Sequence, residues 1–210
     1  YKKILDEQYG EYNIFKRSGA NTLDIMGLYH LFALQQESTV ELEYADKFLM
    51  IPDLMNYYLT GVAANEYTDA TMSLMVDQEH KVWHREMLAQ LGIREDIFCP
   101  IVMPGNVLGN LSLSVCNVFE VPSIPVINVA SHDTASAIAG IPLIRAGNDW
   151  DFISLGSWAI YGMETDSQYI SREVFDSGFA NQGGCDGKTN FVNLFTGLWV
   201  IQQCYERWCK

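Results

Sequence analysis

The chain has 210 residues and a formal net charge of −13, from 13 basic and 26 acidic side chains. This acidic balance argues against binding to a nucleic-acid backbone, which requires clustered positive charge. Hydrophobic residues make up 49% of the chain and charged residues 19%, which is typical of a globular protein, and no apolar run approaches the roughly 20 residues that a membrane span requires. We therefore expect a globular protein with neither a nucleic-acid nor a membrane partner.

The cysteines indicate a cellular compartment. There are five, an odd number, and no two have Cys-x-x-Cys spacing: Cys99, Cys116, Cys185, Cys204 and Cys209. This pattern is typical of reduced thiols and predicts a cytoplasmic protein. Because the chain begins at Tyr1 without a methionine and stops directly behind a helical pattern at Lys210, we expect it to be a piece of a longer protein.

The first half of the chain is predicted to be mainly helical. Apolar residues at three- and four-residue steps predict a helix over 21–38, and Pro52 begins a second helix that continues through Tyr58 and ends at Gly61. Asp53 lies in the first turn of that helix, where a negative charge suits the helix dipole, so it needs no functional explanation. Further helices are predicted over 68–76 and 84–91, followed by a loop region over 93–125.

The pattern changes at residue 125. The apolar, β-branched run 125–130 predicts a strand buried on both faces, followed without a loop by a helix of small residues that starts near Asp133. Two strands are predicted over 151–155 and 158–163, joined by a glycine turn, and a last helix over 192–208. The sequence thus predicts an α/β protein with two subregions that meet near residue 145.

The segment Ser131-His132-Asp133-Thr134 is the first candidate for chemistry. In open α/β sheets, ligands collect at the carboxyl ends of strands beside helix N-termini. A carboxylate kept ionised there by helix amides is a competent general base for attack of a hydroxyl on phosphorus. On spacing alone, a capping role for Asp133 or Ser131 and a packing role for His132 stay open. Adjacent Ser, His and Asp residues cannot form a hydrolase triad, whose three groups must converge in space.

Three other patterns each allow a functional and a structural interpretation. The turn at 154–158 offers backbone amides and a hydroxyl to phosphate oxygens, or is an ordinary hairpin. The segment 181–189 ends in Gly-Lys-Thr, but residue 182 is Gln where a phosphate-binding loop needs its leading glycine, so a flexible turn is predicted. His80 and His84 can share a helix face, but without a third ligand no metal site is predicted.

Six stretches, in this order, resemble the FGGY family of carbohydrate kinases and, within it, the rhamnulokinases. They are Lys-Arg-Ser-Gly at 16–19 with Leu-Tyr-His-Leu at 28–31, then 50–61, 66–70, 130–137, 155–158 and 197–202. The resemblance implies the actin-like, ribonuclease-H-like α/β fold in incomplete form. Residues 1–145 would be the C-terminal part of the first, sugar-binding domain, and residues 146–210 the start of the second, nucleotide-binding domain.

The resemblance also implies an activity, the transfer of the γ-phosphoryl group of ATP to a sugar hydroxyl. The implied cofactors are ATP and Mg²⁺. The residues that match sugar-side positions are His132, Asp133 and Thr134, with Asp133 as the catalytic base. Those that match ATP-side positions are Gly156, Ser157 and Gln202. The implied substrate is a deoxyketose such as L-rhamnulose, giving the 1-phosphate. The alternatives are another sugar such as L-fuculose, or a non-catalytic sugar-binding or regulatory relative.

The sequence departs from the rhamnulokinase pattern at two positions. Leu194 stands where these enzymes usually carry a sugar-contacting Asn, with Asn193 one place earlier, and Gln182 replaces the Glu of Asn-Glu-Gly-Gly. Both departures favour the non-catalytic alternative slightly. The resemblance further implies a phosphate-binding hairpin before Tyr1 and an adenosine-binding segment after Lys210, so we expect these 210 residues alone to be inactive.

Overall fold

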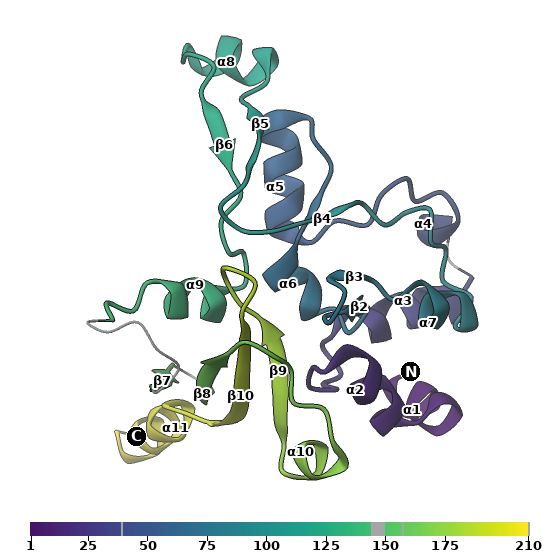
Figure 1. The fold of residues 1–210 in the computed structure, drawn as a ribbon, viewed down its shortest axis with the longest axis vertical. Helices are drawn as coiled ribbons and strands as arrows, with labels where there is room; N and C mark the ends of the chain where they lie inside the picture. The colour runs from purple at the N-terminus through teal and green to yellow at the C-terminus, as the bar shows by residue number, and fades with distance from the viewer. Residues whose placement is uncertain (39, 144–149, 157, 210) are drawn as a thin grey trace.

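The computed structural model describes the chain except residues 39, 144–149, 157 and 210. Figure 1 shows the arrangement of the described elements. In chain order these elements are α1 (Lys2–Tyr9), α2 (Glu11–Ser18), α3 (Gly27–Gln36), α4 (Val40–Glu43), α5 (Ile51–Thr60), β1 (Asn65–Glu66), α6 (Tyr67–Thr71), β2 (Val76–Asp77), β3 (Val82–Trp83), α7 (Arg85–Gln90), β4 (Ile101–Val102), β5 (Val107–Asn110), α8 (Leu113–Phe119), β6 (Pro125–Ile127), α9 (Asp133–Ala139), β7 (Asp151–Leu155), β8 (Trp158–Thr165), α10 (Arg172–Asp176), β9 (Phe179–Gly183), β10 (Thr189–Thr196) and α11 (Trp199–Trp208).

The first half forms a helical region whose core is built by α1, α2, α3, α6 and α7. Its buried members include Leu5, Ile14, Phe32, Tyr67 and Met87. The pattern at 21–38 does mark a helix, but α3 begins only at Gly27, because Met26 has an extended backbone. The helices α1 and α2 were not predicted, since each buries only one to three residues and its apolar periodicity is correspondingly sparse.

The predicted ends of the next elements also differ from the structure. The helix expected over 68–76 ends at Thr71 as α6, because Leu74 takes a positive φ of 69° and the chain then enters β2. The region expected to be loop over 93–125 contains β4, β5 and α8. These strands have two and four residues, too few to show a period of two.

The second half is organised by a four-stranded antiparallel sheet of order β7-β8-β10-β9. Its strand β10 pairs with β8 along its whole length, from Thr189 opposite Thr165 to Thr196 opposite Trp158. The helix predicted over 192–208 was therefore wrong in its first part, because pairing on both edges of β10 overrides the local helical pattern. The helix α11 begins only at Trp199, and its predicted apolar side is exposed, as shown by Phe195, Leu198, Trp199, Tyr205 and Trp208.

One face of this sheet carries a small apolar core. Ile138 of α9, Phe152 of β7 and Val192 of β10 are buried against one another, and we call them the sheet cluster. Leu194 of β10 is partly buried and packs against the sheet cluster. Through Ile138, the helix that begins at Asp133 is thus held on this face of the sheet.

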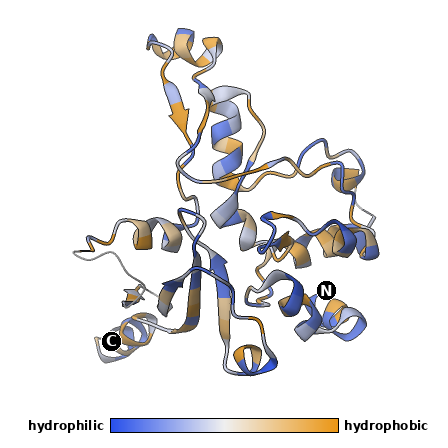
Figure 2. Cartoon of the chain, in the orientation of Figure 1, coloured by the Kyte–Doolittle hydropathy of each residue, from blue (hydrophilic) through white to orange (hydrophobic). Residues whose placement is uncertain are grey.

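The strand predicted at 125–130 is shorter and more exposed than expected. Within the described residues, β6 pairs only with β5, and the side chain of Ile127 is 55% exposed. The expectation of a strand buried on both faces was therefore wrong. Five residues, 128–132, separate β6 from α9, so the expected direct passage from strand to helix was wrong as well. Figure 2 shows that β6 and α8 are nevertheless rich in hydrophobic residues.

Hydrogen bonds join the sheet to the helical region. The Gly183 N–H at the end of β9 donates to Thr71 Oγ1 of α6 over 2.9 Å, and the Asn181 N–H donates to the Gly19 carbonyl over 2.7 Å. A side chain at Gly183 would meet Tyr67 and Thr71 at 2.8–3.1 Å, so glycine permits the close approach of β9 and α6. The predicted domain boundary near residue 145 lies outside the described residues. Among the described helices, none is long and apolar enough to cross a membrane.

Candidate active site

Asp133 is the first residue of α9, and its carboxylate is open to solvent. The side chain is 96% exposed. One carboxylate oxygen, Oδ1, accepts the backbone N–H of Thr134 at 2.6 Å and lies 3.3 Å from the Thr134 hydroxyl. These contacts hold the carboxylate at the N-terminus of the helix, where the helix dipole favours negative charge. A substrate hydroxyl can therefore reach it from solvent.

His132 lies beside this carboxylate and is mostly buried. Its Nε2 is 3.5 Å from Asp133 Oδ1, and its side chain is only 16% exposed. Burial lowers the pKa of His132, a shift that the charge of Asp133 opposes in part. The ring is therefore neutral at pH 7, so its contact with Asp133 is not a full ion pair. Its Nδ1 is buried without a hydrogen-bond partner among the described residues.

The backbone before Asp133 is tied to α6. The Ser131 N–H donates to Glu66 Oε2 over 3.0 Å, and the His132 N–H donates to Thr68 Oγ1 over 3.2 Å. Glu66 is fully buried and caps α6 by accepting the N–H groups of Thr68 and Asp69 at 2.9 and 3.1 Å. The two backbone amides directly before Asp133 are thus held by side chains that lie more than sixty residues earlier in the sequence.

Asp53, at the start of α5, has a structural role that its position in the first turn did not reveal. It is 2% exposed and accepts hydrogen bonds from the Asn65 side chain and from the backbone N–H groups of Glu66 and Met50. Burial raises the pKa of Asp53, while these three donors act in the opposite direction. The helix-dipole explanation was incomplete, because Asp53 also joins α5 to β1.

Asp69 completes a group of four carboxylates around α6. Burial raises the pKa of Asp69 to about 6, with further contributions from the negative charges of Asp53, Glu66 and Asp133. Asp69 is therefore partly protonated near pH 6, and the charge of the candidate base contributes to this shift. Neither Glu66 nor Asp69 was predicted as a site residue, although both lie in the stretch 66–70 that carries the family resemblance.

Two of the predicted ATP-side residues, Gly156 and Gln202, are linked through the backbone of Leu198. The Leu198 N–H donates to the Gly156 carbonyl over 2.8 Å, and Gln202 lies one turn further along α11, where its N–H bonds to the Leu198 carbonyl. A side chain at Gly197 would lie 2.5 Å from the Gly156 oxygen, so only glycine allows this approach. Two stretches some forty residues apart in the sequence thus form one unit.

In the described part of the turn, Gly156 offers open space but not its amide. The Gly156 N–H already donates to the Trp158 carbonyl over 2.8 Å, and a side chain at Gly156 would meet only that oxygen, at 3.6 Å. A phosphate at this turn would therefore approach over the exposed glycine. Gln202 is exposed on α11, and the predicted phosphate contact Ser157 lies outside the described residues.

The two departures from the expected sugar pattern have clear positions. Leu194 packs against the sheet cluster, whereas the amide of Asn193 points to the other face and donates to the Ser177 carbonyl over 3.0 Å. Gln182 of β9 is buried and lies opposite Asn190 of β10, and its Oε1 has no partner among the described residues. Asn193 therefore cannot replace the missing asparagine by a shift of one residue.

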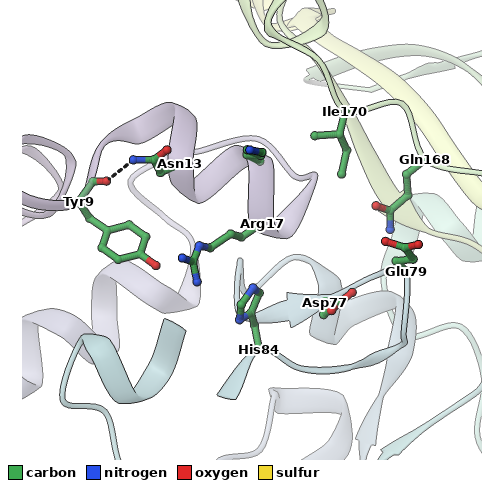
Figure 3. Close-up of a pocket in the computed structure, with 9 residues that line it drawn as sticks. Tyr9, Asn13, Arg17, Asp77, Glu79, His84, Gln168 and Ile170 are labelled. Atoms are coloured by element: carbon green, nitrogen blue, oxygen red, sulfur yellow. Dashed lines mark hydrogen bonds between the residues drawn. The ribbon is translucent and has the colours of Figure 1, made fainter. Parts of the chain in front are cut away.

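A separate cavity of about 420 Å³ lies between α2 and the segment after β8. Arg17 and His84 line its helical side, and Gln168 lies across from them (Figure 3). Figure 1 shows α2 and α9 on opposite sides of β9 and β10, so this cavity is distinct from the site at Asp133.

The two histidines four residues apart have separate structural roles. His84 caps α7 by accepting the Met87 N–H, and His80 bonds to Asp77.

Comparison with known proteins bears on this site. A family model described as the N-terminal domain of the FGGY family of carbohydrate kinases matches residues 2–140. The rhamnulokinase of Enterococcus faecalis is 35% identical to the chain over 195 residues, which are 93% of this chain and 38% of that protein. The rhamnulokinase of Bacteroides thetaiotaomicron is 32% identical over 195 residues, 93% of this chain and 40% of that protein. The chain thus spans about two fifths of the length of these curated relatives.

Solved structures agree in fold. A ligand-bound xylulose kinase from Lactobacillus acidophilus superimposes with a TM-score of 0.81 at 14% identity, covering 97% of this chain and 41% of that one. Glycerol kinase from Plasmodium falciparum with ADP gives a TM-score of 0.82 at 14% identity, covering 98% and 42%. The predicted fold class, an incomplete actin-like, ribonuclease-H-like α/β fold, is confirmed.

Proposed function

The chain belongs to the FGGY family of carbohydrate kinases, and on this basis we propose that the protein of which it forms part phosphorylates a sugar hydroxyl with Mg-ATP. The observation that carries the proposal is the carboxylate of Asp133, exposed at the start of α9 and held by the Thr134 amide. The hydroxyl proton passes to Asp133 as the hydroxyl oxygen bonds to the γ-phosphorus. The bond from that phosphorus to the β-bridging oxygen breaks, and ADP leaves.

The proposed roles of the neighbouring residues follow from their chemistry. Neutral His132 and the hydroxyl of Thr134 contact the sugar. The Gly156 turn, Ser157 and Gln202 form the ATP side, with magnesium offsetting the phosphate charges in an acidic protein. The first domain is proposed to end near residue 145. Five free cysteines favour a reducing, cytoplasmic setting.

The proposed substrate is a deoxyketose such as L-rhamnulose, phosphorylated at O1. The rhamnulokinase relatives support this choice, whereas Leu194, packed against the sheet cluster, does not supply the sugar-contacting amide. L-fuculose is the second substrate to test. A non-catalytic sugar-binding relative is the alternative function, favoured by Leu194 and by Gln182.

The test is a panel of ketoses and aldoses with the protein made from the longest reading frame that encodes these residues. Thermal shift is measured with each sugar, with and without Mg-ATP, and ADP release is followed by a coupled assay. We expect ADP release with L-rhamnulose and a product whose mass has increased by one phosphoryl group. Stabilisation by a sugar without ADP release would support the binding protein and contradict the kinase.

A further inference from the structure

Glu66 is an acidic side chain buried where it has no contact with solvent. Its carboxylate accepts four neutral donors: the backbone N–H groups of Thr68, Asp69 and Ser131, and the Thr68 hydroxyl. Burying a charge is costly unless such donors compensate it. Three of these contacts serve the start of α6. The fourth, to Ser131, joins α6 to the segment before α9, 65 residues further along the chain.

Thr68 forms the second link to that segment. Its hydroxyl donates to Glu66 Oε2 and accepts the His132 N–H at 3.2 Å. The amides of Ser131 and His132 therefore bond to two side chains that are themselves bonded to each other. Asp53 holds the backbone of Glu66 in turn, because it accepts the Glu66 N–H over 2.9 Å.

Asp133 follows these two anchored residues directly, and its own side chain is almost fully exposed. Apart from the contacts of its Oδ1 with Thr134 and His132, little packing surrounds the carboxylate, so the placement of its backbone decides where it points. A general base has to lie within hydrogen-bond reach of the hydroxyl, and a displacement of about 1 Å costs on the order of a hundredfold in rate. A buried carboxylate and hydroxyl directed at the two preceding amides meet this requirement.

We propose that Glu66 and Thr68 are positioning residues that fix the backbone before Asp133, so that its carboxylate meets the sugar hydroxyl. This inference rests on the proposed function. Neither side chain need touch the sugar or ATP. Their contribution is to the reaction step, because substrate binding does not require the base to be in line with the hydroxyl proton.

The test is a pair of substitutions at Thr68 in the protein made from the longest reading frame that encodes these residues. Thr68→Val keeps the shape and removes the hydroxyl, whereas Thr68→Ser keeps the hydroxyl. The matched control is Thr165→Val, since Thr165 is also a buried threonine whose hydroxyl bonds to backbone carbonyls, but on β8. Steady-state kinetics give kcat and the sugar KM, and hydrogen exchange gives the protection of the His132 amide.

For Thr68→Val we expect kcat to fall about 10- to 100-fold while the sugar KM changes less than about threefold. The His132 amide should exchange at least about tenfold faster, because its acceptor is gone. Thr68→Ser should restore kcat to within about threefold of the unchanged protein, and Thr165→Val should leave both kcat and the exchange of His132 unchanged.

The proposal is overturned if Thr68→Val keeps normal kcat, if Thr68→Ser fails to restore it, or if Thr165→Val loses as much. Asp133→Asn separates this failure from that of the proposed function. If Asp133→Asn abolishes turnover and Thr68→Val does not, the base stands and the positioning role is wrong. If the unchanged protein releases no ADP with any sugar, the proposed function is wrong and the positioning role with it.

Discussion

The charge of Asp69 should make the stability of the protein depend on pH in an unusual direction. Most carboxylates in folded proteins have lowered pKa values, so stability is lost on acidification. Burial and three neighbouring carboxylates instead raise the pKa of Asp69 from 3.8 to about 6. The folded protein then binds this proton more tightly than the unfolded chain. The contribution of Asp69 is fully present below about pH 4 and is lost as the pH rises through about 6.

The magnitude follows from that change in proton affinity. A pKa raised from 3.8 to about 6 corresponds to at most about 3 kcal/mol at neutral pH. Asp69 is only partly buried, so solvent screening reduces the cost to about 1–2 kcal/mol. We therefore expect Asp69→Asn to raise the free energy of unfolding by this amount at pH 7.5 and by less at pH 4.5, where the folded carboxyl is still mostly protonated.

The assay is urea unfolding of both proteins at the two pH values, with the free energy obtained from the midpoint and the slope. Asp24→Asn is the control, because Asp24 is exposed in the turn before α3. As a substitution on the surface, the control should change the free energy of unfolding by less than about 0.5 kcal/mol. A gain for Asp69→Asn that is the same at pH 4.5 and 7.5, or a loss at pH 7.5, would refute the electrostatic reasoning.

Three further predictions concern other parts of the structure. Gly197→Ala places a methyl group 2.5 Å from the Gly156 oxygen, so it should destabilise the protein by about 1–3 kcal/mol. It should also raise the KM for ATP more than the KM for the sugar. Equal effects on both KM values would count against an ATP-side turn. In an NMR titration, His132 should become protonated at lower pH than His80. Burial lowers the pKa of His132, whereas a hydrogen bond to the Asp77 carboxylate raises the pKa of His80. The reverse order would contradict the burial of His132. Leu194→Asn, in the layer beside the sheet cluster, should cost about 2–4 kcal/mol in unfolding experiments, and an unchanged stability would show that the leucine is not packed there.

The sequence predicted best those elements that are marked by local signals. Pro52 and Gly61 gave the limits of α5, and the turn at Gly156 gave the hairpin of β7 and β8. The prediction from sequence was wrong where pairing between strands decides the structure. The residues of β10 have a local helical pattern, but they form a strand because β8 and β9 pair with its two edges. The short strands β4 and β5 carried no periodicity to read.

The site was predictable only in part, for a similar reason. Asp133 could be placed at the start of a helix from its immediate neighbours, and the structure has it there. The contacts of Glu66 and Thr68 join residues more than sixty positions apart, and spacing along the chain contains no information about them. The exposure of β6 was also not predictable from the sequence. An apolar run indicates that a strand can be buried, but it does not show whether another element packs against it.

In the proposed mechanism, Asp133 takes the proton from the sugar hydroxyl. The direct measurement is the rate of ADP release at saturating sugar and Mg-ATP for the unchanged protein and for Asp133→Asn, with Asp24→Asn as the control. We expect Asp133→Asn to lower kcat by about 10²- to 10⁴-fold, with an unchanged unfolding midpoint and a normal rate for the control. An Asp133→Asn protein that turns over within about tenfold of the unchanged one would contradict the assignment of the base.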